Sequence, residues 1–309
     1  MGTAPDGARI LGFEFVEYAA PDPAAFGAYL SRLGFAAIAR HRSKDVVLYR
    51  QNGINIIVNS DVESFEQSYS HLRGVRICAI ALRVRDAAAA YEQALRKGAW
   101  EVESQVRAME VNIPGIAGAG ETVTYFIDRF DHPSIYDIDF VTIPHDVPAG
   151  ASLTRIHSIT YGVRDGRARD CADFCAAVLG LEEVVADGPA APGGATTVVR
   201  TADDGVRLVF SEPLAVGMTA AAADAPFESV QHVTLASRDI DATVRALEAR
   251  GMDVDRIPAP RRALRIVTGP DVGVNDPRGR PEHAGTVFFE VVEEAIMTGG
   301  LAVTAVAHD

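Results

Sequence analysis

The sequence contains no apolar run of 18 or more residues, the length that a membrane-spanning helix requires. Its first residues also lack a basic segment followed by a long apolar core, so no secretory signal peptide is expected. Only three cysteines occur in 309 residues, at spacings that fit neither a zinc ribbon nor an even-numbered disulfide framework. These absences predict a protein of the reducing cytoplasm that does not insert into a membrane.

Positive charge is also scarce, because 29 lysines and arginines face 42 aspartates and glutamates, for a net charge of −13. A surface that binds nucleic acid needs clustered Lys and Arg, so no nucleic-acid partner is expected. A local basic pocket for a small anion is compatible with this balance. Apolar residues make up 48% and charged residues 23% of the chain, which indicates a soluble globular protein. The length suits two domains of about 150 residues each.

The chain repeats itself at a fixed spacing. Residues 77–87 read ICAIALRVRDA, and residues 230–240 read VQHVTLASRDI, 153 positions later. In each copy a strand pattern is followed by an aspartate, Asp86 or Asp239, and then by an amphipathic helix that ends on a glycine. The aspartate predicts a helix N-cap, and the glycine predicts a C-terminal position with positive φ.

A second pair of phrases extends this repeat, because FEFVEYAAPD near the start matches IHSITYGVRD at an offset of 143. The smaller offset implies about ten additional residues in the second copy, and GPAAPGGA (188–195) is a candidate location. The segment 142–155 contains two prolines and small polar residues, as is typical of a linker. The sequence therefore predicts an α+β fold of two duplicated domains, residues 1–148 and 149–309.

Three strand positions differ between the copies in a way that indicates metal binding. At matching offsets, the first copy has Glu14, Ala79 and Asp137, and the second has His157, His232 and Glu290. Two imidazoles and a carboxylate are the ligand set of non-haem Fe(II) oxygenases, which keep coordination positions open for substrate and O2. A single histidine in a strand is more commonly a hydrogen-bonded core residue. Three such differences in one copy favour the metal site.

Another carboxylate competes for the third ligand position. Glu282 follows an Asp-Pro turn in the segment 275–283, which reads NDPRGRPEH. Glu290 is preferred because it stands inside the apolar run GTVFFEVV and keeps the offset of 153 from Asp137.

Several phrases resemble the vicinal oxygen chelate superfamily and, more closely, the family of 4-hydroxyphenylpyruvate dioxygenase and hydroxymandelate synthase. They include FVEYAAPD, NIPGIAGAG and SIYDIDFV in the first half, and RIHSITYGV, SVQHVTLAS and TVFFEVVE in the second. The resemblance extends to Glu293, with a poor match between about residues 255 and 285. It implies two tandem domains of this superfamily, each of paired βαβββ modules that form a curved mixed sheet around a site.

The resemblance also implies a chemistry. The N-terminal domain would be free of metal, and His157, His232 and Glu290 would hold ferrous iron, Fe(2+), in the C-terminal domain. The substrate would be a 2-oxo acid, with an arylpyruvate as the expected class, and O2 would be the second reactant. The 2-oxo acid would chelate Fe(II), and its decarboxylation would be coupled to its own oxygenation. A cytoplasmic homo-oligomer is expected.

Two hydroxyl residues match positions near the substrate in this family. Ser211 stands where the family has an amide side chain, and Thr197 stands where it has a serine. Either hydroxyl could donate a hydrogen bond to a substrate oxygen. Half-buried strand hydroxyls without a function explain both residues equally well.

Two family features are missing from the sequence. No substrate-facing glutamine is found before the final glutamate, and the C-terminal segment contains no phenylalanine that could close over an aromatic ring. The aromatic clamp for a hydroxyphenyl ring is therefore unaccounted for, and in its place stands APRRALRIVTGP (259–270), with Arg261, Arg262 and Arg265. Arg265 is the candidate for bidentate recognition of a second carboxylate, although a solvated basic loop is the more ordinary explanation.

Two other functions are compatible with the same layout. An extradiol catechol ring-cleavage dioxygenase would need a histidine base and a tyrosine near the metal, for which the second half offers His283 and Tyr161. A ligand-binding protein of the same fold would need no redox chemistry and no iron.

Overall fold

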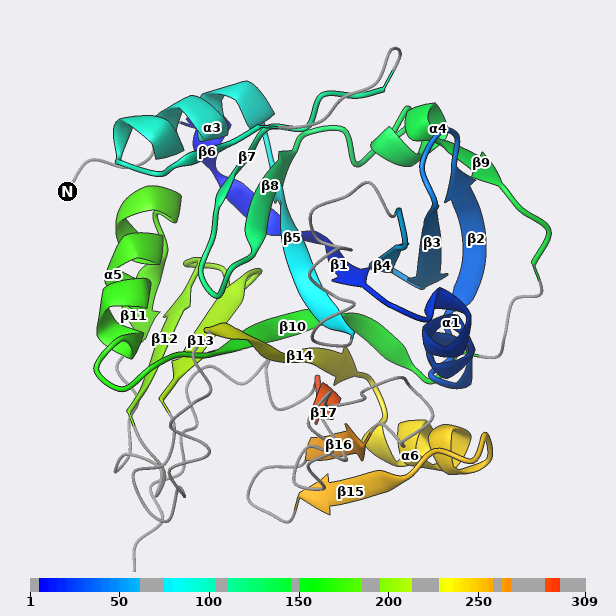
Figure 1. Ribbon diagram of the computed structural model, residues 1–309. Coiled ribbons are helices and arrows are strands. Elements are labelled where there is room, and N and C mark those ends of the chain that lie inside the picture. The colour runs from blue at the N-terminus through cyan, green and yellow to red at the C-terminus, as the bar shows by residue number, and fades with distance from the viewer. Residues whose placement is uncertain are drawn as a thin grey trace, which may run out of the picture.

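The computed structural model describes residues 6–61, 75–103, 110–145, 150–184, 195–212, 228–257, 263–267 and 287–294. These residues form two large mixed sheets, one from each half of the chain, with helices along their flanks (Figure 1). The first sheet has the strand order β6-β7-β8-β5-β1-β4-β3-β2-β9, and the second has the order β11-β12-β13-β10-β14-β17-β16-β15. The expected α+β fold of two tandem sheet domains is confirmed.

The strands of the first sheet are β1 (Ile10–Ala19), β2 (Ala36–His41), β3 (Val46–Gln51), β4 (Ile54–Asn59), β5 (Arg76–Val84), β6 (Glu101–Val102), β7 (Gly115–Ala117), β8 (Val123–Ile127) and β9 (Phe140–Thr142). Those of the second are β10 (Leu153–Gly162), β11 (Glu182–Val184), β12 (Thr196–Arg200), β13 (Arg207–Ser211), β14 (Ser229–Ser237), β15 (Val254–Ile257), β16 (Ala263–Val267) and β17 (Val287–Glu293). The helices are η1 (Asp6–Ala8), α1 (Pro23–Arg32), α3 (Ala87–Arg96), α4 (Ile135–Asp139), α5 (Ala168–Leu179) and α6 (Ile240–Glu248).

The duplication is visible in the central strand pairs. β1 pairs with β5 as β10 pairs with β14, antiparallel in both cases and with three irregularities at corresponding places. The pair Phe15–Ala81 in the first sheet, for example, corresponds to the pair Ser158–Thr234 in the second. Because strand register is specified by many side chains at once, agreement along the whole pair confirms the repeat that the sequence predicts.

The last strand of each repeat corrects one part of the expected alignment. β8 pairs in parallel with β5, and β17 pairs in parallel with β14, so β8 is the counterpart of β17. Tyr125, opposite Ala81, therefore corresponds to Glu290, opposite Thr234. The expected equivalence of Asp137 and Glu290 is wrong, because Asp137 lies in helix α4, where it forms a capping box with Ser134.

The helix signals of the repeat are confirmed. The carboxylates of Asp86 and Asp239 cap α3 and α6, each accepting a hydrogen bond of 2.8 Å from a backbone N–H three residues later. Gly98 and Gly251 follow the two helices with φ of 94° and 70°, a conformation that residues with a Cβ rarely adopt. Each helix is thus held between two specific ends.

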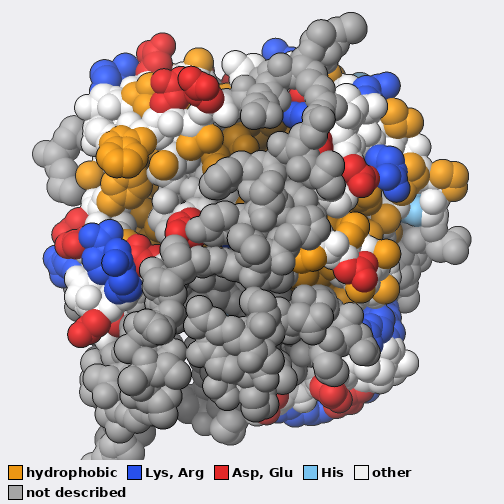
Figure 2. Space-filling view, in the orientation of Figure 1, with side chains coloured by type: hydrophobic (Ala, Val, Ile, Leu, Met, Phe, Trp, Pro, Cys, Tyr) orange, Lys and Arg blue, Asp and Glu red, His pale blue; other side chains and the backbone are white. Residues whose placement is uncertain are grey.

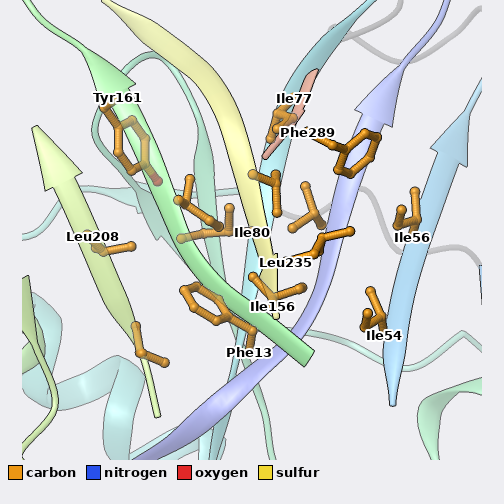
Figure 3. Packing of buried hydrophobic residues seen from close by; sticks show 14 of the residues in the cluster. Phe13, Ile54, Ile56, Ile77, Ile80, Ile156, Tyr161, Leu208, Leu235 and Phe289 are labelled. Carbon is orange, nitrogen blue, oxygen red and sulfur yellow. The ribbon is translucent and has the colours of Figure 1, made fainter. Parts of the chain in front are cut away.

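The two sheets pack face to face over one large core (Figure 3). Phe13 and Ile80 of the first sheet meet Ile156 and Leu235 of the second in this core. The face of each sheet that contributes to it is called the shared face below, and the opposite face is called the outer face. Burial of this apolar surface is what ties the halves together.

One residue of the shared face connects the first half to β17. The ring of Phe289 lies 6.1 Å from that of Tyr18 and 6.3 Å from that of Tyr29, between ring centroids, and all three side chains are buried. Aromatic pairs at such distances add to the stabilisation from burial. The first half therefore supports the strand that carries Glu290.

The expected boundary between residues 148 and 149 falls between β9 and β10, within the segment 146–149, which lies outside the described residues. Most of the segment 188–195 also lies outside them. None of the described helices is both long and apolar enough to cross a membrane. In the view of Figure 2, acidic and basic side chains are interspersed over the described surface.

Candidate metal centre

A β-bulge in β10 directs His157 to the outer face. Ile156 and Ile159 both belong to the shared core although they are three residues apart, so the alternation of the strand shifts between them. The shift coincides with a register irregularity between Ile156 and Ser158. Both intervening residues, His157 and Ser158, therefore lie on the outer face, which is the way in which bulges re-aim side chains.

His232 and Glu290 lie on the same outer face. Their neighbours Val233 and Phe289 are in the shared core, so alternation turns His232 and Glu290 outward. The distance from His232 Nε2 to Glu290 Oε2 is 3.9 Å. Glu290 is 4% exposed, and the His232 side chain is 24% exposed. The carboxylate is thus shielded from water, whereas the imidazole remains partly exposed to water.

This pair fits a shared cation. Nitrogen and carboxylate oxygen ligands stand about 2.0–2.2 Å from a transition-metal ion, so two ligands of one ion can be at most about 4.3 Å apart. The separation of 3.9 Å between His232 and Glu290 satisfies this limit. A buried carboxylate also favours a cation partner, because an isolated buried charge is costly.

The third expected ligand is less closely placed. His157 is on the same face and 9% exposed. Among the described residues, however, no group of three His, Cys, Asp or Glu side chains lies close enough together to hold a metal ion. The structure brings His232 and Glu290 together and puts His157 on their face without closing the triad. The competing Glu282 lies outside the described residues.

The expected substrate residues divide between the two faces. Ser211 is the strand partner of Gly162 and follows Phe210 of the shared core, so alternation puts it on the outer face. Thr197 pairs with Phe210 of the shared core and therefore lies on the shared face. This position does not support the expected contact of Thr197 with a substrate, because His232 and Glu290 lie on the opposite face of the same sheet.

The structure describes the backbone position of Arg265 in β16. It is the backbone partner of Glu290 across β16 and β17. Its neighbours Leu264 and Ile266 belong to the shared core. Arg261 and Arg262 lie outside the described residues.

The outer face of the second sheet also carries several polar residues that a search of the sequence for metal ligands does not identify. They are Ser158, Thr160, Gln231 and Thr234. Gln231 sits at a second bulge, and its side chain lies over Gly162, where a Cβ would be only 2.2 Å from the Gln231 Nε2 atom. These polar residues alternate with apolar ones along β10 and β14, which is a pattern that the sequence contains. The bulges interrupt the alternation, so the sequence alone does not tell which residues share a face.

The outer face of the first sheet is filled instead. Phe15 and Tyr125, at the positions of Ser158 and Glu290, bring their ring centroids to 6.3 Å. Gly115 leaves room for Tyr125, because a Cβ there would come within 2.9 Å of the ring. The first sheet therefore has two packed aromatic rings at the positions where the second sheet has Ser158 and Glu290.

An ion pair between the buried Glu14 and the partly exposed Arg83 lies on the same face of the first sheet. Glu14, at the position of His157, is 1% exposed and accepts hydrogen bonds from Arg83 and from Asn55 Nδ2, the latter at 3.1 Å. Arg83 therefore supplies the positive charge that Glu14 needs in a buried position.

Two tandem mixed sheets, each built around the same central strand pair, define a protein of the vicinal oxygen chelate class. Comparison with known proteins agrees with this fold. Residues 4–141 match the family model described as "Hydroxyphenylpyruvate dioxygenase, HPPD, N-terminal". Residues 155–280 match the model of the "Glyoxalase/Bleomycin resistance protein/Dioxygenase superfamily".

The chain belongs to the 4-hydroxyphenylpyruvate dioxygenase family. It is 36% identical over 254 residues to a 4-hydroxyphenylpyruvate dioxygenase from a Pseudomonas species, across 79% of this chain and 70% of the relative. It is also 34% identical to a protein named hemolysin VllY from Vibrio vulnificus, across 78% of this chain and 71% of that protein. This membership makes the chain an enzyme, a non-haem dioxygenase of the family type.

Solved structures share the fold at low sequence identity. A mutant of 4-hydroxymandelate synthase from Streptomyces coelicolor superimposes with a TM-score of 0.70 at 16% identity, across 92% of this chain and 93% of that chain. A fusion of a xylose isomerase-like TIM barrel with a 4-hydroxyphenylpyruvate dioxygenase gives a TM-score of 0.70 at 22% identity. The match covers 94% of this chain, which spans half the length of that fusion protein.

Proposed function

We propose that this chain is an Fe(II)-dependent dioxygenase that decarboxylates and oxygenates a 2-oxo acid, with an arylpyruvate such as 4-hydroxyphenylpyruvate as the substrate class. One observation carries the proposal: His232 Nε2 and Glu290 Oε2 lie 3.9 Å apart on a polar face of the second sheet. The equivalent face of the first sheet is closed by Phe15 and Tyr125. The names of the relatives support the substrate class.

In this proposal His232 and Glu290 hold the metal, with His157 as the third protein ligand. Bound Fe(II) supplies the activation of O2 and the oxidising power, which no amino-acid side chain provides. Glu290 contributes one negative charge to the site. A metal held by these three side chains would also be able to accept the keto and carboxylate oxygens of a 2-oxo acid.

The remaining polar residues of the outer face bind and orient the substrate body. The hydroxyl groups of Ser211 and Thr160 are suited to donate hydrogen bonds to substrate oxygens. Gln231 adds an amide above Gly162, close to the strand that carries Ser211. Arg265, the backbone partner of Glu290, is the proposed site of recognition for a further anionic group.

The extradiol alternative is weakened by the position of Tyr161. This tyrosine belongs to the shared core, is 1% exposed and stacks on Phe210 with ring centroids 5.2 Å apart. Burial raises the pKa of its hydroxyl. Tyr161 therefore faces away from His232 and Glu290 and is not available as the tyrosine that ring cleavage needs. His283 lies outside the described residues.

Metal analysis followed by an oxygen-uptake screen tests the proposal. The purified chain is loaded with Fe(II) without air, its iron content is measured, and O2 uptake is followed with 4-hydroxyphenylpyruvate, other 2-oxo acids and catechols. We expect about one iron per chain and uptake of O2 with release of CO2 from a 2-oxo acid. Activity with catechols alone would favour ring cleavage, and absence of iron binding would favour the ligand-binding protein.

The cytoplasmic location and the homo-oligomeric state remain predictions. Cell fractionation tests the first and light scattering of the purified protein tests the second.

A further inference from the structure

Thr234 contacts the candidate ligand Glu290 directly. Its hydroxyl donates a hydrogen bond of 3.3 Å to Glu290 Oε2, the oxygen that lies 3.9 Å from His232 Nε2. Thr234 is 1% exposed and Glu290 is 4% exposed, so water does not compete strongly for this bond. The two residues are also backbone partners across β14 and β17.

We infer that Thr234 is a positioning residue, whose hydroxyl holds the Glu290 carboxylate in the orientation that binds the metal. The inference rests on the proposed function, because it assigns a role to the metal pair. A glutamate side chain has three rotatable bonds, and a hydrogen bond to one carboxylate oxygen removes part of that freedom. Ligand carboxylates in metal sites are commonly held by such hydrogen bonds.

The position of Thr234 suits this role. Strand residues on one face are two apart, so Thr234 lies next to His232 along β14 and next to Glu290 across the sheet. As a β-branched residue it has a restricted χ1 angle, which gives its hydroxyl a defined direction. Thr234 therefore contacts the carboxylate from the same strand that presents the imidazole.

The first half of the chain offers an internal comparison. Ala81 occupies the position of Thr234, and its strand partner is Tyr125 in place of Glu290. The hydroxyl is thus present in the copy that has the carboxylate and absent from the copy that has a tyrosine. This is the distribution expected if the hydroxyl serves the carboxylate.

Metal binding by three variants tests the inference. Thr234→Val removes the hydroxyl and keeps the branched shape, whereas Thr234→Ser keeps the hydroxyl. Thr124→Val is the matched control, because Thr124 is a buried threonine of the first sheet at 3% exposure. Affinity is measured by anaerobic calorimetric titration of metal-free protein with Co(II), together with the visible spectrum of bound Co(II) and the thermal midpoint of the metal-free protein.

We expect Thr234→Val to bind Co(II) about 10–100-fold more weakly than the original protein, with a changed Co(II) spectrum. Thr234→Ser should restore most of the affinity, and Thr124→Val should match the original. If Thr234→Val does not fold, Thr234→Ala, which copies the first half, supplies the same comparison.

Two results would overturn the inference. Equal affinity in Thr234→Val and the original protein would show that the hydroxyl does not position the ligand, while the proposed function would stand. Failure of the original protein to bind Co(II) or Fe(II) would remove the proposed function and the inference together.

Discussion

Glu14 and His157 occupy the same β-bulge in the two halves of the chain. Glu14 lies between Phe13 and Phe15 where β1 changes register against β5, and His157 lies at the corresponding point of β10. The backbone therefore presents both side chains on the outer face of their sheets. In the first half this side chain is a carboxylate that forms an ion pair with Arg83, and in the second it is the imidazole that we propose as the third metal ligand.

Replacing His232 by alanine should abolish iron binding and leave the fold intact. The equivalent strand position in the first sheet is Ala79, so a methyl group is tolerated in this backbone. Iron content after anaerobic loading and the thermal midpoint of the metal-free protein are the measurements. His145→Ala is the control, since His145 is an exposed histidine of the first half. Full retention of iron in the His232 variant would remove this residue from the site.

Glu290→Gln should separate stability from metal binding. The buried carboxylate is costly without a cation, so the neutral amide should leave the metal-free protein as stable or more stable. The original protein should gain about 2.7 kcal/mol when Fe(II) is present at a hundred times its Kd, and the variant should lose that gain. Thermal unfolding with and without metal measures both effects. Glu248→Gln, at an exposed glutamate of α6, is the control.

Arg265→Gln should change the choice of substrate. If Arg265 binds a second anionic group, its loss should raise KM at least about tenfold for 2-oxo acids that carry such a group, since a hydrogen bond to a charged group contributes about 1.5–3 kcal/mol. Substrates without that group should be affected little. Arg256→Gln on β15 is the control, because Arg256 lies at the exposed surface and pairs with Glu248. Equal changes for both kinds of substrate would contradict the role.

Arg83→Leu should destabilise the first half. It leaves the Glu14 carboxylate buried without its cation, at a cost of roughly 2–4 kcal/mol, toward the lower end because Arg83 is 34% exposed. The double variant Glu14→Leu/Arg83→Leu should recover part of the loss, because neither charge remains. Urea unfolding measures the free energies. Arg96→Leu, at an exposed pair with Glu92, should cost no more than about 0.5 kcal/mol.

Stability should fall above pH 9 through the thiol of Cys175. Burial raises the pKa of this thiol from 9.0 to about 12. Between these values the unfolded chain loses the proton and the folded chain keeps it, so the free energy of unfolding decreases as pH rises, by about 1.4 kcal/mol per pH unit. The buried tyrosines act in the same direction at higher pH. The free energy of unfolding is measured by urea unfolding between pH 8 and 10.5. In Cys175→Ala its decrease with pH should be smaller by the contribution of one titrating proton, and an unchanged pH dependence would contradict the assignment.

The amino-acid sequence by itself determined the duplication, the helix ends and the identity of the ligand candidates. The caps at Asp86 and Asp239 depend on neighbouring residues alone, so local reading is sufficient. The contrast between Ala79 and His232 is likewise visible once the phrases are aligned.

Only the tertiary structure decided which residues share a face. Pairing of β17 with β14 makes Tyr125 the counterpart of Glu290 and brings Thr234 opposite that candidate ligand. The bulge of β10 puts Ser158 on the outer face with His157, and the register of β12 turns Thr197 to the shared face. A shift of one residue exchanges the two faces of a strand, and that shift depends on partners distant in the chain. The sequence pattern reports on neighbouring residues, whereas the face that a residue takes after a bulge depends on how its strand pairs with distant strands.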